Sequence, residues 1–303
     1  MLKKSAVLFL LPCLFVVFSA CSRNQPFANN DAKPLLALSI LPQEWFAARL
    51  AGDRVRTLVL AGPGQNPHSY EPSPRQMQEL AQAGAWVLSG IEFEISLLPK
   101  IQGVFSTLVI IDGTEGIAFR ALEEHDDAHD DHYDDHNIDR HTWLGQNPSK
   151  ILAAHIRDAL ILIDPEGEEQ YHEKYAALIG EIDAEFDSLR RELAPLRGSV
   201  VFVYHPSFGY FLDEFGIRQE ALESGGMEPG PRDLSRLVDR ARQERAAAIF
   251  VQAQFPVHAA QVVADAVGAQ IIVLDHLSPD WLANIRRMGE ALKAAATGST
   301  GNE

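Results

Sequence analysis

The sequence predicts an α/β protein of two lobes, each a parallel sheet flanked by helices, with one long rigid helix joining them. From residue 35 onward, short apolar runs of strand length alternate with helical patterns, as is typical of parallel sheets. One helical pattern near the midpoint is much longer than the others. The length of 303 residues is too great for one small domain and suits two lobes of ordinary size.

The first 20 residues have the pattern of an export signal. Lys3 and Lys4 precede an apolar run at residues 6–17, and small residues stand just before Cys21. We therefore expect a signal peptide at residues 1–20 and lipidation of Cys21, with an ordinary signal peptide cleaved nearby as the alternative. The apolar run is shorter than the ~20 residues that a membrane-spanning helix needs. The mature protein should work in the periplasm or at the cell surface.

Residues 21–34 are polar and read as a lipid anchor and tether, and the N-terminal lobe follows at residues 35–164. Its expected strands are residues 35–41, 55–60, 86–88 and 108–111, and its expected helices are residues 43–51, 74–83 and 148–163.

Residues 123–140 interrupt this lobe with a segment rich in histidine and aspartate. Its histidines are His125, His129, His132 and His136. With almost no apolar residues to bury, the segment should be a mobile loop. Because histidine is the commonest transition-metal ligand, we interpret the loop as a secondary, low-affinity metal collector, the alternative being a merely solvated acidic loop.

Residues 165–197 form the long helical pattern. Its apolar positions recur at spacings of three and four: Tyr171, Tyr175, Leu178, Ile182, Phe186, Leu189 and Leu193. We interpret it as a linker between lobes, although a surface helix of one lobe would show the same stripe. The C-terminal lobe, residues 198–303, should contain strands at residues 200–204, 248–252 and 270–274, and helices near residues 232–245, 256–267 and 281–296.

Four residues, two in each half of the chain, stand where a strand should give way to a loop: His68, His141, His205 and Asp275. In parallel sheets, ligands bind beyond the carboxyl ends of the strands. Three imidazoles and one carboxylate suit Zn²⁺, which prefers four tetrahedral nitrogen, sulfur or oxygen ligands. We therefore expect a metal site between the lobes.

Composition is consistent with a cation-binding protein. The formal net charge of −16 argues against binding nucleic acid or anionic lipid through the protein surface. The two cysteines, Cys13 and Cys21, both lie in or next to the leader, so the mature domain has neither a disulfide nor a thiolate ligand.

Several motifs resemble the zinc-binding lipoproteins of high-affinity zinc ABC transporters, the metal-binding cluster A-I family of solute-binding proteins. The sequence NPHSYEPSP at residues 66–74 is similar to the family's first-ligand loop, and HPSFGYF at residues 205–211 to its third-ligand segment. The segment with Asp275, followed by Trp281, resembles the family's last-ligand segment. The resemblance implies His68, His141, His205 and Asp275 as ligands of a transported Zn²⁺.

It also implies a monomeric, non-enzymatic binding protein that is anchored to the membrane through its lipid. Such a protein delivers Zn²⁺ to a permease and its ATPase subunit. A surface adhesin with a structural metal remains an alternative. A zinc hydrolase is another, although the sequence has no His-Glu-x-x-His motif and Glu71 precedes a proline in a predicted turn.

The residue at the third expected ligand position, His205, indicates which metal is preferred. Manganese-selective relatives typically carry a carboxylate there, whereas this chain has His205, and nitrogen ligands favour Zn²⁺ over the harder Mn²⁺. The chain departs from the family at His276, where relatives often have proline. We expect His276 to be exposed, and leave a supporting role beside the site or a role as alternative ligand open.

The remaining histidines, His155, His172 and His258, fall in or at the start of predicted helices and should have surface or packing roles. Three aromatic residues near the ligands, Trp143, Phe208 and Tyr210, should line the metal site or belong to the core.

Overall fold

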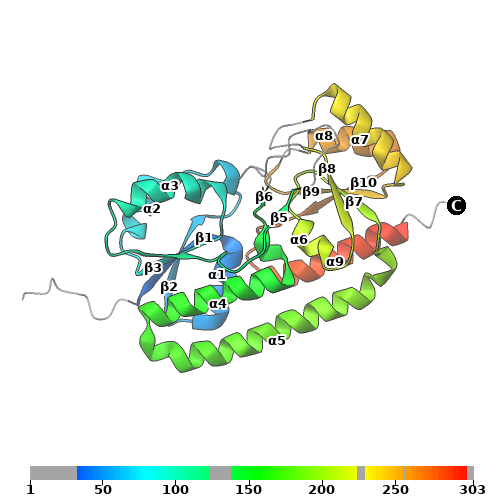
Figure 1. Cartoon of the computed structure of the whole chain (residues 1–303). Coiled ribbons are helices and arrows are strands. Elements are labelled where there is room, and N and C mark those ends of the chain that lie inside the picture. The colour runs from blue at the N-terminus through cyan, green and yellow to red at the C-terminus, as the bar shows by residue number, and fades with distance from the viewer. Residues whose placement is uncertain (1–32, 123–137, 224–228, 256, 299–303) are drawn as a thin grey trace, which may run out of the picture. The chain divides into compact units, whose positions relative to one another are not determined.

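The computed structural model describes residues 33–122, 138–223, 229–255 and 257–298 (Figure 1). The predictions for the signal peptide, for Cys21 and for most of the tether lie outside these ranges, and so do those for the loop histidines His125, His129, His132 and His136. In the described part of the chain, no helix is both long and apolar enough to cross a bilayer.

The first half of the chain forms a parallel sheet in the order β2-β1-β3-β4. Its strands are β1 (Leu35–Ile40), β2 (Arg56–Ala61), β3 (Ala85–Leu88) and β4 (Val109–Asp112). The accompanying helices are α1 (Leu41–Ala51), α2 (Pro74–Leu80), α3 (Glu92–Gln102) and α4 (Gln146–Ile163). Every residue of the interior strand β1 is buried, which explains its almost unbroken apolar sequence.

The second half repeats this arrangement in a parallel sheet of order β10-β9-β7-β8. Its strands are β7 (Val200–Val203), β8 (Arg218–Ala221), β9 (Ala248–Gln252) and β10 (Gln270–Leu274). Its helices are α6 (Gly209–Asp213), α7 (Pro231–Gln243), α8 (His258–Val267) and α9 (Trp281–Gly298).

The predicted long helix is α5 (Glu168–Glu192), which has 25 residues and packs against α4 and α1 of the first half and α9 of the second (Figure 1). It is shorter than predicted because short 3₁₀ turns, Pro165–Gly167 and Ala194–Leu196, replace its ends. Proline is tolerated in a first turn but not inside a helix, so these turns limit α5 on both sides.

One hydrophobic core runs through both halves. Helix α9 helps to join them, because the ring of Trp281 packs 5.5 Å from that of Trp45 and 4.9 Å from that of Phe46, both on α1. A smaller cluster lies within the second half, around Phe202 and Ile249. The shared core holds the two sheets in a fixed relation.

Some elements were not predicted. They are α3, α6, β8 and the antiparallel pair β5 (Arg120–Ala121) and β6 (Ile138–Asp139). Helix α3 contains Pro99, and a proline inside a segment argues against predicting a helix there. Strand β8 has no apolar run. The others are too short to give a periodic signal.

Candidate metal centre

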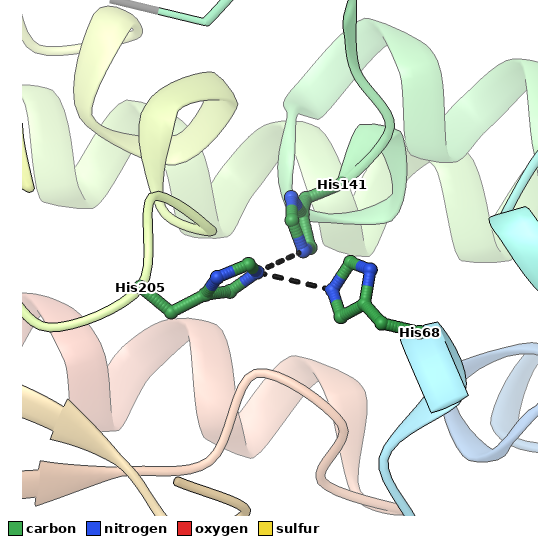
Figure 2. Close-up of side chains that lie close together, drawn as sticks. All are labelled: His68, His141 and His205. Carbon is green, nitrogen blue, oxygen red and sulfur yellow. Dashed lines mark hydrogen bonds between the residues drawn. The ribbon is translucent and has the colours of Figure 1, made fainter. Parts of the chain in front are cut away.

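Three of the four predicted ligands come together. His68 lies in a 3₁₀ turn (Pro67–Ser69) after β2, and His141 directly precedes another (Thr142–Leu144). His205 comes two positions after the end of β7. The Nε2 atoms of His68 and His141 lie 3.1 and 3.2 Å from Nε2 of His205. The three rings therefore direct one nitrogen each toward a common point (Figure 2).

The spacing of these nitrogens suits zinc. Zinc–nitrogen bonds of ~2.0–2.1 Å at tetrahedral angles put neighbouring ligand nitrogens about 3.3 Å apart. The observed 3.1 and 3.2 Å are close to that value. All three nitrogens lie within 4.8 Å of one another, so shifts on the order of 1 Å bring the three histidines to the spacing of one bound ion.

A carboxylate accepts a hydrogen bond from the other nitrogen of each ring. His68 Nδ1 donates to Glu92 at 2.9 Å, His141 Nδ1 donates to Asp139 at 2.9 Å, and His205 Nδ1 donates to Glu223. An ionised carboxylate only accepts, so it keeps the proton on Nδ1 and leaves a lone pair on Nε2. Three lone pairs facing one another repel, and a cation between them turns that repulsion into attraction.

The pair His205–Glu223 is almost completely buried. Burial lowers the pKa of His205 well below 6.5 and raises the pKa of Glu223 to about 7. Both shifts have the same cause, because a low-dielectric surrounding disfavours either charge. The low pKa keeps His205 unprotonated, which metal binding requires, and a nearby divalent cation would favour the ionised form of Glu223.

Asp139, which orients His141, is itself held by residues of both halves. Its carboxylate is fully buried and lies 2.8 Å from Arg120 Nη1, while Arg120 Nε donates to Asp213 on α6 at 2.9 Å. The hydroxyl of Tyr210 donates to the Asp139 carbonyl at 3.1 Å. Asp139 also accepts from the backbone N–H of His141 at 2.9 Å. His141 is thus tied to the second half of the chain.

Two tryptophans strengthen that connection. Trp143 Nε1 donates to the His276 carbonyl at 2.8 Å, and Trp281 Nε1 donates to the Trp143 carbonyl at 2.6 Å. Both indoles are almost completely buried. Phe208 and Tyr210 are buried as well, so these aromatic residues belong to the core around the site.

The comparison with known families agrees with this geometry. Residues 37–295 match the family described as "Zinc-uptake complex component A periplasmic". The chain belongs to this family. The resemblance noted in the sequence is therefore confirmed over most of the chain.

Individual relatives in this zinc-uptake family are distant. The chain is 27% identical over 294 residues to the zinc-binding lipoprotein AdcA of Streptococcus pneumoniae, a match that covers 92% of this chain but only 55% of AdcA. It thus spans about half the length of that relative. ZnuA of Bacillus subtilis, a high-affinity zinc uptake system protein, is 25% identical over 288 residues, with 91% of this chain and 90% of ZnuA covered.

A solved structure confirms the fold class. A crystal structure of ZnuA is 31% identical to this chain and superposes with a TM-score of 0.80, covering 87% of this chain and 99% of the other. The predicted α/β class, with parallel sheets flanked by helices and one long helix, is correct.

The fourth predicted ligand, Asp275, does not join the three histidines. Its Oδ1 accepts from Gln254 Nε2 at 2.8 Å and from the backbone N–H of Leu277 at 3.0 Å. The carboxylate therefore stabilises the turn after β10.

The expectation that His276 is exposed is wrong. His276 is 2% exposed, and its ring centre lies 5.6 Å from that of His141. Burial lowers the pKa of His276 well below 6.5, so the ring is neutral. A role in or beside the metal site, which the sequence left open, agrees with this position.

The other histidines lie outside the cluster, as expected. His155 bonds to the Glu115 carbonyl at 2.9 Å, His172 lies 3.9 Å from Glu168 on the same helix, and His258 begins α8.

Sequence reasoning missed Glu92, Asp139, Glu223 and Arg120. Only Asp139 could have been found from the sequence. An aspartate two positions before a histidine can accept hydrogen bonds from both the backbone N–H and the ring of that histidine. Glu223 follows the unpredicted strand β8, and Glu92 begins the unpredicted helix α3. Their proximity to the histidines depends on the tertiary fold.

Proposed function

We propose that this chain captures Zn²⁺ outside the cytoplasm and delivers it to the permease of an ABC importer. One observation carries the proposal: three histidine Nε2 atoms converge at 3.1 and 3.2 Å, each on a ring whose Nδ1 donates to a carboxylate. His68, His141 and His205 are the proposed ligands. We keep Asp275 only as a residue that could turn toward the ion.

The ligand chemistry favours zinc. Three imidazole nitrogens suit Zn²⁺, whereas Mn²⁺ is better served by oxygen ligands. The relatives support the same metal, because AdcA is named a zinc-binding lipoprotein and ZnuA a high-affinity zinc uptake system protein.

The geometry supports binding rather than hydrolysis. A zinc hydrolase needs a general base beside the metal-bound water. The carboxylates of Glu92, Asp139 and Glu223 instead lie at the Nδ1 side of the histidines, away from the point where the Nε2 atoms meet. They can orient ligands but are poorly placed to deprotonate a water on the metal.

The proposal includes the predicted domain organisation. A signal peptide at residues 1–20 exports the chain, Cys21 carries a lipid, and residues 21–34 form a tether to two lobes (35–164 and 198–303) around the linker helix. The His/Asp-rich segment 123–140 gathers zinc weakly. The partners are the permease and its ATPase subunit, and the protein acts as a monomer.

The test combines metal analysis with uptake. Protein purified without chelator should hold one tightly bound zinc per chain, and the gene should restore zinc uptake only in cells that have the cognate permease. His205→Ala should abolish both, whereas His172→Ala, on the exposed face of α5, should change neither. Tight zinc binding without permease-dependent uptake would favour the adhesin alternative.

A further inference from the structure

His276 lies against the three-histidine cluster. It follows β10 and Asp275, and its ring centre is 5.6 Å from that of His141 and 6.3 Å from that of His205. The ring also stacks on Trp143, with centres 6.3 Å apart and planes inclined by 24°. The position next to two proposed ligands raises the question of what the imidazole does there.

One nitrogen of this ring lacks a partner. Among the described residues, no group hydrogen-bonds to Nδ1 of His276, although that atom is buried. Leaving a buried polar atom unpaired costs roughly 1–3 kcal/mol, and such atoms in folded proteins usually mark a bound water, ion or ligand. Aromatic packing alone would be served better by a side chain without nitrogen.

The neighbouring carboxylate is engaged elsewhere. Asp275 Oδ1 accepts from Gln254 and from the Leu277 backbone, and Asn284 Nδ2 donates to the Asp275 carbonyl at 2.7 Å. The His276 carbonyl accepts from Trp143. Redirecting Asp275 Oδ1 would break two hydrogen bonds, whereas moving His276 Nδ1 breaks none among the described residues.

The separations of the ring centres show what movement is required. If zinc lies ~2.0–2.1 Å from each ligating nitrogen in a tetrahedral site, the centres of two ligating rings are about 5 Å apart. The three proposed ligands show ring-centre separations of 4.8, 5.0 and 5.6 Å. His276 is at 5.6 Å from His141 and 6.3 Å from His205, and like Asp275 it stands outside the group of three histidines, so its ring must move toward the cluster to bind the same ion.

We propose that His276 is the fourth donor to the metal, in the place that the family resemblance gives to Asp275. The inference rests on the three-histidine site proposed above. The resulting site has four neutral nitrogen ligands, with its negative charge kept on the carboxylates behind the rings. Such a set selects strongly against Mn²⁺ and other oxygen-preferring cations.

Two matched variants of the full mature protein test the proposal. His276→Phe keeps an aromatic ring against Trp143 and removes the unpaired nitrogen, and Asp275→Asn keeps an oxygen that can accept from Leu277. In competition with a zinc chelator, His276→Phe should bind zinc at least 10-fold more weakly, while Asp275→Asn should stay within about twofold of the wild type. The melting temperature of metal-free His276→Phe should not fall.

X-ray absorption of the zinc-loaded proteins provides an independent measurement. The wild type should show four imidazoles around zinc and His276→Phe three. A count of three in both proteins, or weaker binding in Asp275→Asn but not in His276→Phe, overturns the proposal and returns the fourth position to oxygen. If His68→Ala and His205→Ala also bind zinc normally, the three-histidine site itself is wrong.

Discussion

Gly209 occupies a position where a single methyl group should disturb the metal site from a distance. It is the first residue of α6, and the ion pair of Arg120 and Asp139 passes directly over it. A Cβ at this position would overlap the Arg120 guanidinium and lie 2.8 Å from Asp139 Oδ2. Gly209→Ala should therefore displace the ion pair that orients His141.

The change that Gly209→Ala makes in the free energy of unfolding is the sum of one stabilising and two destabilising contributions. In a helix, alanine is favoured over glycine by about 1 kcal/mol, so the change would stabilise α6 if there were room. Overpacking a filled site costs about 1–3 kcal/mol, and separating a buried carboxylate from its partner costs about 3–5 kcal/mol. These terms add to a net loss of about 3–7 kcal/mol in the free energy of unfolding if the pair separates, and of at most about 2 kcal/mol if it only shifts. Because Asp139 holds His141 at two atoms, zinc affinity should fall ~10–100-fold.

The assay pairs urea unfolding of metal-free protein with zinc competition against a chelator. Gly180→Ala is the matched control, since Gly180 lies within α5 and an added Cβ meets nothing within 4 Å. It should stabilise the protein by about 0.5–1 kcal/mol and leave zinc affinity unchanged. If Gly209→Ala binds zinc like the wild type, the Arg120–Asp139 pair does not position His141, and the reasoning fails.

Three further predictions concern the ligands, the carboxylates and the loop. His205→Glu should lower the affinity for zinc relative to Mn²⁺, because oxygen replaces nitrogen; an unchanged ratio in calorimetric titrations would indicate that cavity geometry decides selectivity. Glu223→Gln should weaken zinc binding more than Glu92→Gln in the chelator assay, because Glu223 is 4% exposed and Glu92 is 45% exposed; equal effects would contradict this. Deleting residues 124–135 should remove only weak zinc sites. In titrations of the intact protein, these weak sites should lose zinc first on acidification. An isolated imidazole protonates near pH ~6.5, whereas burial lowers the pKa of His205. If the deletion also removes the tight site, the loop supplies a primary ligand.

Much of the fold could be predicted because buried parallel strands are continuous apolar runs. Strands such as β1 and β9 are buried along their whole length and were placed within a residue or two. Strand β8, of sequence RQEA, lies at the edge of its sheet and carries no such run. Its existence depends on pairing with β7, which only the folded chain provides.

The proposed metal site was predictable to the extent that its histidines follow strands. His68 and His205 stand beyond β2 and β7, and the edge rule for parallel sheets brings them together. The carboxylates that orient the rings follow no comparable rule. In so acidic a chain, many aspartates and glutamates are equally plausible partners until the backbone places Glu223 beside His205.

The last part of the site, Asp275 and His276, shows why a ligand cannot be transferred by position alone. An aspartate just after a strand can bind a metal, or it can accept from the N–H two residues later and close a turn. Asp275 does the second, because its Oδ1 lies 3.0 Å from the nitrogen of Leu277. With that carboxylate engaged in the turn, the next residue is the one placed beside His141 and Trp143. A proline there would offer no donor, whereas His276 has a buried nitrogen without a partner among the described residues. The residue that follows the aspartate thus decides whether a second nitrogen or oxygen donor is available to the proposed site.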